Sequence, residues 1–371
     1  MNARLIVADS EHNADMLYAT GMFVPDPFIW LEARGKTYVV MSDLEIDRAR
    51  KKARVDRVLS LTRYQNALRR EGVKSPRLSD ILRRVLRELR IRQVEVPREF
   101  PLGLAKRLRG VRLKVCRDAF FPERTIKDAS EVREIAAAMR LAEEGMGAAI
   151  RALRSSRVGR SGWLYVRGMK LTSEDVQGVI NAKIAALGGS AVHTIVAGGN
   201  QACDPHETGH GPLRAHQPII IDIFPRDLRT GYWGDITRTV VRGRASERVR
   251  RLYVAVLQAQ EIAFQKLRAG IDGSEVHKAI QDVFRREGYS TGRKRGRMQG
   301  FFHGTGHGVG LEIHERPRVS VSSDRLETGH VVTVEPGLYY PGVGGVRLED
   351  VVVIRKNGNT NLTKFPKFLE I

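Results

Sequence analysis

The sequence predicts an α+β fold in which a larger pseudo-symmetric domain follows a smaller α/β domain. In residues 126–371, a pair of helical segments followed by strand-like segments occurs twice in succession. This order predicts a sheet covered by helices on one face. Residues 1–125 instead mix short strands with a basic helical stretch. A connector that contains Pro122 separates these two patterns, and we place the domain boundary after residue 125.

The first round of the repeat begins with a helix that Asp128 or Ser130 can cap, and its apolar positions recur at helical spacing. A second helix starts at a capping box formed by Thr172 and Asp175, and a pair of glycines ends it. The strand-like segments that follow are VHTIVA, PIIIDIF and GDITRTVVRG.

The second round repeats this order with different residues. Its helical segments are ERVRRLYVAVLQAQEIAFQKL and SEVHKAIQDVFRREG. Its strand-like segments are FFHGTGHGVGLEIH, HVVTVEPGLYY and GVRLEDVVVI. Because the two rounds share little sequence identity, the repeat is one of pattern only, and it predicts two similar halves of one domain.

The first 125 residues predict fewer elements. RLIVA and TYVVMS predict strands, the second of which follows a turn at Arg34 and Gly35. From Asp47 to about Arg92, apolar positions recur at helical intervals between basic residues, and Pro76 interrupts the pattern. We therefore expect helical structure over this stretch.

The composition is that of a folded globular protein. The chain has 371 residues, of which 42% are hydrophobic and 28% are charged. Its two cysteines, Cys116 and Cys203, are far apart, which suits a reducing compartment and argues against a disulfide framework or a thiolate zinc site. The first twenty residues lack the apolar region of a signal peptide, and no run approaches the roughly 18 residues of a membrane helix. We expect a cytoplasmic protein without a membrane partner.

The formal net charge of +21 is concentrated in one segment. Between Asp47 and Lys114 there are 22 Lys and Arg against seven Asp and Glu, and 22 − 7 gives +15. Such a field attracts nucleic acid, acidic peptides or anionic lipid. The aromatic residues that would stack on bases are not interleaved with these charges. A solvated basic face is therefore expected and a nucleic-acid partner is not, although an RNA-binding or protein-binding scaffold stays an alternative.

Four strand-like segments each carry an acidic residue where a buried strand should be apolar. These residues are Asp222 in PIIIDIF, Asp235 in GDITRTVV, Glu335 in VVTVEPGLY and Glu349 in GVRLEDVVV. One of them alone could form a salt bridge or end a strand, but four on neighbouring strands would repel one another. Two divalent cations would neutralise all four carboxylates. The pattern therefore predicts a dinuclear metal site.

The donor types favour hard cations. Two cations that share bridging carboxylates generate a nucleophile at neutral pH. Because carboxylates dominate the predicted donor set, Mn²⁺ ranks first as the cofactor, and Co²⁺ and Zn²⁺ are alternatives. One imidazole would complete the set.

The stretch FFHGTGHGVGLEIHE, residues 301–315, offers three imidazoles among glycines. The glycines let the backbone approach a metal or substrate closely, and they oppose the helix that an HExxH zinc site requires. In an extended chain, His303 and His307 share a face whereas His314 has the opposite parity. Unless the strand bulges, all three cannot be ligands. One ligand and two imidazoles that face the substrate are the simplest partition.

These motifs resemble the metallopeptidases of the pita-bread fold, a family that includes aminopeptidase P, prolidase, methionine aminopeptidase and the metal-free creatinase. The resemblance rests on IDIF followed by GDITRT, then HGTGHGVGLEIHE, VEPGLY and VRLED, in this order. It covers residues 126–371, and it implies a pseudo-symmetric pita-bread catalytic domain. Residues 1–125 resemble the creatinase-type N-terminal domain of the same family.

The resemblance also implies the metal ligands. They would be Asp222, Asp235, His307, Glu335 and Glu349. Asp235 and Glu349 would bridge both cations, and Glu335 would also act as general base and proton shuttle for the attacking water.

Further residues match substrate-side positions of the family. His314 matches the imidazole that steadies the tetrahedral intermediate, and His303 matches another histidine near the substrate. His206 matches a histidine that contacts the substrate beyond the scissile bond; His210 competes for this role, but His206 follows Pro205 as in the family motif. A last position, Arg347, matches an arginine of the aminopeptidase P and prolidase branch.

The complete ligand set distinguishes the chain from creatinase, and His303 with the N-terminal domain distinguishes it from methionine aminopeptidases. The resemblance therefore implies an Xaa-Pro aminopeptidase that takes proline-containing peptides, with an Xaa-Pro dipeptidase (prolidase) as the alternative and a non-peptidase hydrolase as a further one. By analogy with the family we expect a homodimer.

Two features depart from the family pattern. The loop IFPRDLRTGYW, which contains Arg226, is about two residues longer than in the aminopeptidase P pattern. The basic stretch GRKRGR, residues 292–297, either is a mobile basic loop or overhangs the site, where it would select the C-terminal carboxylate of a peptide.

Overall fold

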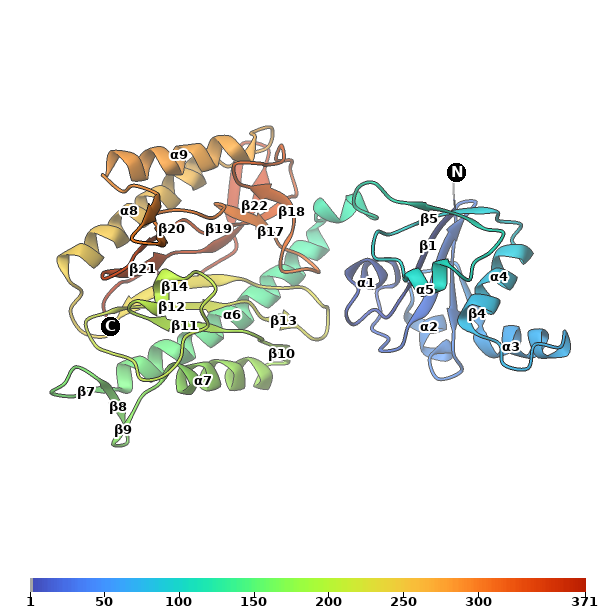
Figure 1. The fold of residues 1–371 in the computed structure, drawn as a ribbon, viewed down its shortest axis with the longest axis horizontal. Coiled ribbons are helices and arrows are strands. Elements are labelled where there is room, and N and C mark those ends of the chain that lie inside the picture. The colour runs from blue at the N-terminus through green and yellow to red at the C-terminus, as the bar shows by residue number, and fades with distance from the viewer. Residues whose placement is uncertain (1–2) are drawn as a thin grey trace. The chain divides into compact units, whose positions relative to one another are not determined.

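The computed structural model describes residues 3–371. Contacts divide the chain into two compact units, Met1–Arg124 and Thr125–Ile371 (Figure 1). Each unit has its own hydrophobic core. The assignment of the first unit as a creatinase-type domain stays a prediction. No helix among residues 3–371 has the length and apolar character needed to cross a membrane.

The described residues of the first unit form a six-stranded sheet with helices packed against it. The strands are β1 (Ala3–Ala8), β2 (Phe28–Ala33), β3 (Lys36–Met41), β4 (Arg57–Ser60), β5 (Gln93–Val96) and β6 (Arg112–Val115). The helices are α1 (Ala14–Thr20), α2 (Ile46–Lys52), α3 (Leu61–Arg70), α4 (Leu78–Glu88) and α5 (Leu102–Ala105). The strand order is β4-β3-β2-β1-β5-β6, with antiparallel pairing in the centre and parallel pairing at both edges.

One prediction for this unit was wrong. The stretch from Asp47 to Arg92 is not helical throughout, because Arg57–Ser60 forms the parallel edge strand β4. Val58 pairs with Val39 of β3 there. This contact is distant in sequence, so helical periodicity does not reveal it. The strands predicted at RLIVA and TYVVMS are present as β1 and β3.

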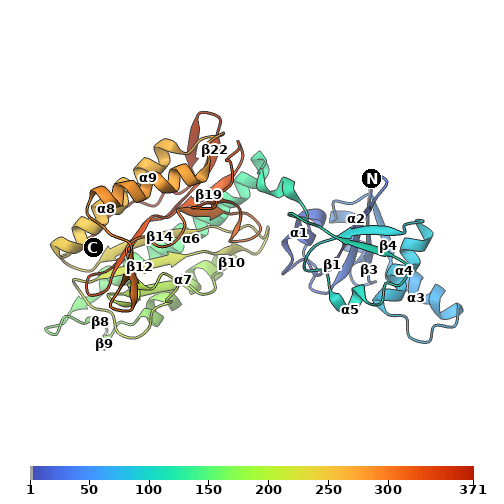
Figure 2. The same cartoon turned by 45° about the horizontal axis from the view of Figure 1, so that its top comes forward.

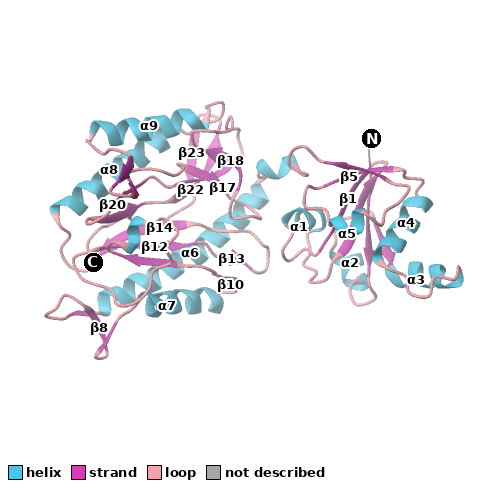
Figure 3. Cartoon of the chain, in the orientation of Figure 1, coloured by secondary structure: helices cyan, strands magenta, loops and turns pink. Residues whose placement is uncertain are grey.

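The second unit contains the predicted repeat of two helices followed by strands (Figures 1 and 3). The first round comprises α6 (Ala129–Ser155), α7 (Ser173–Ala186), β11 (Ile195–Gly198), β12 (Pro218–Ile223) and β14 (Ile236–Val241). The second comprises α8 (Glu247–Lys266), α9 (Gly273–Arg286), β17 (Gly306–Gly308), β18 (Glu315–Val319), β19 (Val331–Val334), β22 (Asp350–Arg355) and β23 (Gly358–Asn361). The pseudo-symmetric α+β fold class is therefore confirmed.

Short elements complete the second unit. They are the ribbon β7 (Arg157–Val158), β8 (Leu164–Val166) and β9 (Met169–Lys170), and the pairs β10 (Gly189–Ser190) with β13 (Arg226–Asp227), β15 (Gly292–Lys294) with β16 (Arg297–Gln299), and β20 (Gly337–Tyr340) with β21 (Gly344–Arg347).

The sequence signals at the helix starts are confirmed. Asp128 caps α6, and its side chain accepts hydrogen bonds from the backbone of Ser130 and Glu131. Thr172 and Asp175 form the expected capping box at the start of α7. These caps satisfy the free backbone N–H groups at each helix start.

The two sheets of this unit meet at a single bridge. Strands pair in the order β11-β12-β14 in the first sheet and β18-β17-β19-β22-β23 in the second. Thr237 of β14 pairs with Glu349, directly before β22, and so joins them. Helices α6 and α7 pack against the first sheet, and α8 and α9 pack against the second. Figure 2 shows the same arrangement from a second direction.

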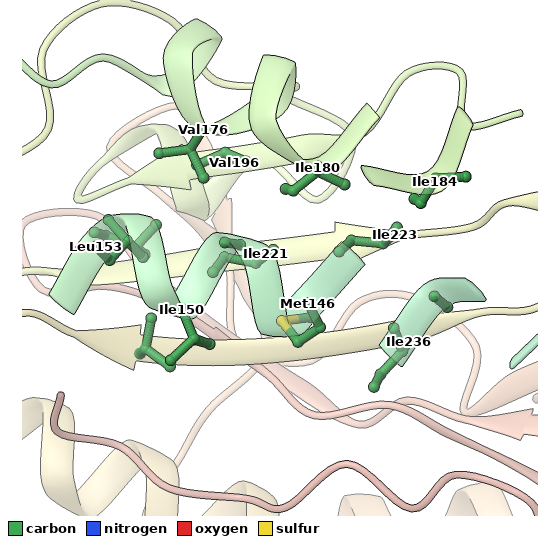
Figure 4. Packing of buried hydrophobic residues seen from close by; sticks show 14 of the residues in the cluster. Met146, Ile150, Leu153, Val176, Ile180, Ile184, Val196, Ile221, Ile223 and Ile236 are labelled. Carbon is green, nitrogen blue, oxygen red and sulfur yellow. The ribbon is translucent and has the colours of Figure 1, made fainter. Parts of the chain in front are cut away.

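An aliphatic core fixes α6 and α7 to the first sheet. Figure 4 shows its members Met146, Ile150, Leu153, Val176, Ile180, Ile184, Val196, Ile221, Ile223 and Ile236. All ten side chains are buried. Alternate residues of β12 therefore face the helices, which leaves Asp222 to point to the opposite side of the sheet.

Two helical glycines provide a matched test of this packing. A Cβ atom at Gly145 of α6 would lie 2.9 Å from Cδ1 of Ile184, whereas one at Gly178 of α7 would meet nothing within 4 Å. We expect Gly145→Ala to lower the free energy of unfolding and Gly178→Ala to raise it by about 0.5–1 kcal/mol, because alanine is the better helix former. Urea unfolding measures both, and a Gly145→Ala protein as stable as Gly178→Ala would contradict the tight α6–α7 contact.

Candidate metal centre

The four predicted carboxylates and His307 line one cavity of about 1430 Å³. Asp222 lies inside β12, but the other three acidic residues lie at strand ends. Asp235 directly precedes β14, Glu335 directly follows β19, and Glu349 directly precedes β22. Four segments that are separate in sequence therefore place their carboxylates at one cavity.

Strand register brings two of these carboxylates, Asp222 and Glu349, to neighbouring positions on either side of Thr237. Asp222 pairs with Thr237 across the β12–β14 ladder. On its other edge, Thr237 pairs with Glu349. The Thr237 hydroxyl donates a hydrogen bond to Oε2 of Glu349 over 2.7 Å, and this bond orients the carboxylate.

The distances at the centre suit a shared cation. Asp235, His307 and Glu349 each offer a ligand atom within 4.8 Å of the others. Nε2 of His307 lies 3.7 Å from Oδ2 of Asp235 and 3.6 Å from Oε1 of Glu335. The predicted ligands are therefore close together in the structure, and their binding of metal stays a proposal.

His307 has the protonation state of a ligand. Its Nδ1 atom lies 3.1 Å from the carbonyl oxygen of Gly308, to which an Nδ1–H group can donate. This leaves the Nε2 lone pair directed at the carboxylates. Burial, followed by the neighbouring His314 imidazole, lowers the pKa of His307 to about 4, so the ring is neutral at neutral pH.

The carboxylates are held in an environment that disfavours their charge. Burial, followed by the charge of Glu349, raises the pKa of Asp235 well above its usual range. Burial and then Glu335 do the same to the pKa of Glu349. Burial raises the pKa of Glu335 to about 7. Cations would remove this penalty.

The donor set fits two divalent cations. Oδ1 of Asp222 is buried and has no hydrogen-bond partner among residues 3–371. Within the same residues, Asp222 is the only one of the four that forms an ion pair with an arginine, Arg347, over 2.6 Å. The remaining negative charge needs another counterion. Carboxylate oxygens and one imidazole are donors that Mn²⁺, Co²⁺ and Zn²⁺ accept.

Tyr339 is a part of the site that sequence reasoning missed. Its buried hydroxyl accepts a hydrogen bond from Nη1 of Arg347 and lies 2.9 Å from Nε2 of His303. Nδ1 of His303 lies 2.8 Å from the carbonyl oxygen of Gly304. Both ring nitrogens of His303 are thus occupied, which agrees with a role beside the substrate instead of as a ligand. Only the alternation in GLYY could have indicated that Tyr339 points inward.

The glycine-rich run contains the bulge that the sequence left open as a possibility. The register between β17 and β18 shifts between His307 and Gly308. His314 lies in the connection between β17 and β18 and not on an extended strand with His307, so the parity argument does not apply to it. The rings of His307 and His314 lie 4.3 Å apart. A Cβ atom at Gly306 would lie 2.0 Å from the carbonyl oxygen of Thr333. The bare backbone is therefore a requirement of close strand packing.

The remaining predicted residues separate into two groups. His206 and His314 line the cavity, whereas the competitor His210 does not belong to the lining residues. Arg226 lies in β13 and donates a hydrogen bond to the carbonyl of Gly231. Residues 292–297 form the β15–β16 hairpin and are likewise not among the lining residues.

Such a site, buried carboxylates and a neutral imidazole in an open cavity, defines the class of metal-dependent hydrolytic enzymes. The sequence pattern of Metallopeptidase family M24 matches residues 133–356. The chain belongs to this family. The predicted family and the predicted enzyme class are confirmed.

Three relatives show how far the similarity extends. Over 329 residues, the chain is 30% identical to an Xaa-Pro dipeptidase of Pyrococcus horikoshii, a match that covers 88% of this chain and 83% of that protein. The crystal structure of an X-Pro aminopeptidase from Thermotoga maritima has a TM-score of 0.84 and 24% identity, covering 100% of this chain and 98% of that one. A prolidase structure from Pyrococcus horikoshii has a TM-score of 0.81 and 26% identity, with coverages of 100% and 95%.

Removal of divalent cations should destabilise the protein more as pH rises. The folded-state pKa values of Asp235, Glu335 and Glu349 are raised by burial and mutual repulsion. As pH rises, these carboxyl groups ionise in the unfolded chain at the ordinary pKa of about 4, before they ionise in the folded protein. The free energy of unfolding of the metal-free protein therefore falls as pH rises above about 4. Cations offset this loss.

Thermal unfolding with Mn²⁺ and with EDTA measures the effect. The difference in Tm should be small at about pH 5 and large at about pH 8. A difference that shrinks with pH would contradict the buried carboxylate cluster.

Proposed function

We propose that this protein hydrolyses the bond between an N-terminal residue and proline, and that dipeptides of the Xaa-Pro type are its preferred substrates. The observation that carries the proposal is the convergence of Asp222, Asp235, His307, Glu335 and Glu349 at one cavity. The names of the Pyrococcus and Thermotoga relatives support the choice of an Xaa-Pro bond.

When bound, two divalent cations, with Mn²⁺ ranked first, would lower the pKa of water and polarise the scissile carbonyl. Asp222, Asp235, His307, Glu335 and Glu349 would hold them. Among these residues, Asp235, His307 and Glu349 each offer a ligand atom within 4.8 Å of the others.

The chain's own residues then have distinct tasks. Glu335 would accept a proton from the attacking water and pass it to the proline nitrogen as the C–N bond breaks. His314, beside His307, would donate a hydrogen bond to the oxygen of the scissile carbonyl. His206, on the cavity wall, would contact the substrate beyond the scissile bond. His303 and Arg347, joined through the Tyr339 hydroxyl, would keep this wall rigid.

Arg318 supports the preference for dipeptides. It pairs directly with His307 across β17 and β18, and antiparallel partners project to the same face of a sheet. Arg318 also lines the cavity. After burial and His206, its charge is a further cause of the lowered pKa of His314. Its guanidinium forms no ion pair with another of the described residues 3–371. It is therefore available to a carboxylate.

The Arg318 guanidinium would distinguish a dipeptide from a longer peptide. In a dipeptide, the free carboxylate belongs to proline and follows the scissile bond directly. An arginine beside the metal centre can bind this group in a bidentate manner. The basic stretch 292–297, which the sequence suggested for this task, does not line the cavity.

A second candidate is the Xaa-Pro aminopeptidase activity that the sequence favoured. The cavity volume of about 1430 Å³ supports it, since pockets for small molecules are usually about 300–1,000 Å³. The cytoplasmic location and the homodimer stay predictions.

Replacement of a proposed metal ligand tests the reaction. We expect Mn²⁺-loaded protein to cleave Xaa-Pro dipeptides and Asp235→Ala to lower kcat by more than ~100-fold, because loss of a ligand should cost more than loss of a group that only orients one, which costs about 10–100-fold. Asp282, a partly exposed residue of α9 that pairs with Arg285, provides the matched control Asp282→Ala, which should leave kcat unchanged. Proline release measures the activity of both variants, and circular dichroism confirms their folding.

Activity that persists in Asp235→Ala would contradict the ligand assignment. Metal binding without turnover of any Xaa-Pro peptide would indicate a different C–N hydrolase.

Substitution of Arg318 tests the dipeptide preference. Arg318→Gln should raise KM for Xaa-Pro dipeptides by ~10-fold or more, because a charge-assisted hydrogen bond is lost. It should hardly affect tripeptides or dipeptide amides, whose proline lacks a carboxylate. Arg293→Gln, in the β15–β16 hairpin, is the matched control and should behave as wild type. Equal effects of Arg318→Gln on dipeptides and longer peptides would favour the aminopeptidase, and an effect of Arg293→Gln would restore the hairpin as the carboxylate-selecting element.

A further inference from the structure

Arg238 is a buried arginine on the same strand as the metal-site residue Thr237. It lies in β14 and is only 2% exposed. It is not among the residues that line the cavity, so it cannot touch a substrate there. Burial of a guanidinium destabilises the fold unless its N–H groups form hydrogen bonds. The hydrogen-bond partners of Arg238 therefore indicate its role.

The guanidinium holds two backbone carbonyls of the metal centre. Its Nη1 group donates to the carbonyl of Thr237 over 2.9 Å and to the carbonyl of Glu349 over 2.7 Å. The N–H of Glu349 donates to the Thr237 carbonyl as well, over 3.0 Å. Together with the Thr237 hydroxyl on the Glu349 carboxylate, these bonds fix Glu349 at its N–H, its carbonyl and its side chain.

The other side of the guanidinium holds the end of the chain. Nη2 donates to the carbonyl of Phe365 over 2.6 Å, and Nε donates to the carbonyl of Pro366 over 3.2 Å. Nη2 also lies 2.9 Å from Oδ1 of Asp350, a buried carboxylate that Lys367 approaches from the C-terminal segment.

Residues 361–371, here named the C-terminal segment, end beside the last residue of β14, Val241. Glu370 pairs with Val241 in parallel orientation, and the N–H of Val241 donates to the carbonyl of Leu369 over 2.7 Å. Phe365 and Phe368 pack against the aliphatic core. The segment is therefore anchored at the end of β14 and on the core, and the carbonyls of Phe365 and Pro366 are in place to accept from Arg238.

We propose that Arg238 is a positioning residue of the metal centre, through which the C-terminal segment fixes the bridging carboxylate Glu349. This inference rests on the proposed metal site. Without the guanidinium, the carbonyls of Thr237 and Glu349 would be buried without this donor, and Glu349 would be free to shift. Residues that orient a ligand in this way usually contribute about 10–100-fold to metal affinity.

Arg242, the first residue after the same strand, offers a matched control. Its Nη1 group donates to the carbonyl of Ile371 over 3.2 Å and its Nη2 group to the carbonyl of Ser156 over 2.9 Å. It thus also anchors the C-terminal segment, but none of its hydrogen bonds goes to Thr237 or Glu349. A purely structural role of these arginines would make the two substitutions equivalent.

Titration calorimetry with MnCl₂, combined with thermal unfolding, tests the proposal on the full chain. Arg238→Met and Arg242→Met should both lower Tm. Arg238→Met alone should weaken Mn²⁺ binding, by about 10–100-fold, and alter the visible spectrum of the Co²⁺-loaded protein. Should Arg238→Met fail to fold, Arg238→Lys keeps the charge near Asp350, but its single nitrogen cannot join the metal-centre carbonyls to those of the C-terminal segment as Nη1, Nη2 and Nε of arginine do. It should therefore also weaken Mn²⁺ binding.

Three results would overturn the proposal. Wild-type Mn²⁺ affinity in a folded Arg238→Met or Arg238→Lys protein would show that Arg238 does not position Glu349. An equal loss of affinity in Arg242→Met would show that both arginines act only through stability. A wild-type protein that binds none of Mn²⁺, Co²⁺ and Zn²⁺ would refute the proposed metal site itself, and with it this inference.

Discussion

Repulsion among buried negative charges is the constraint on which the second unit depends. Four segments that are distant in sequence bring Asp222, Asp235, Glu335 and Glu349 to one cavity. Apart from Asp222, none forms an ion pair with an arginine within residues 3–371. An aliphatic core alone would not hold such a cluster together, because ionised carboxylates in a poorly solvated site push the strands apart. Under the proposed metal binding, counterions from solution would relieve this repulsion, and metal binding would be coupled to the stability of the fold.

The pseudo-symmetric fold supplies a rigid frame for this cluster. Each half packs two helices against its own sheet, and the bridge between Thr237 and Glu349 joins the halves at the metal centre. Close backbone approach at Gly306 brings β17 near β19, which places His307 opposite the carboxylates. Arg238 of β14 donates hydrogen bonds both to the carbonyl of Glu349 and to the carbonyl of Phe365, and so links the metal centre to the C-terminal segment. The reactive side chains face a cavity, whereas the groups that hold them are buried behind it.

The sequence revealed those features that a local pattern encodes. Asp222 could be predicted because a carboxylate interrupts the aliphatic run PIIIDIF, and the glycines around His307 excluded a helix. Features that depend on strand register could not be predicted. Arg318 faces His307 only because β17 and β18 pair as they do, and Tyr339 meets His303 only in the folded chain. Strand β4 escaped detection for the same reason, since its pairing with β3 decides its conformation.

Metal stoichiometry tests the central claim most directly. Elemental analysis of the purified protein after saturation with Mn²⁺ and removal of free metal should find two ions for each chain, since two divalent cations match four carboxylates in charge. Binding of no ion, at a pH where the carboxylates of the unfolded chain are ionised, would contradict the account, because the repulsion at the cavity would then have to be relieved by protons alone.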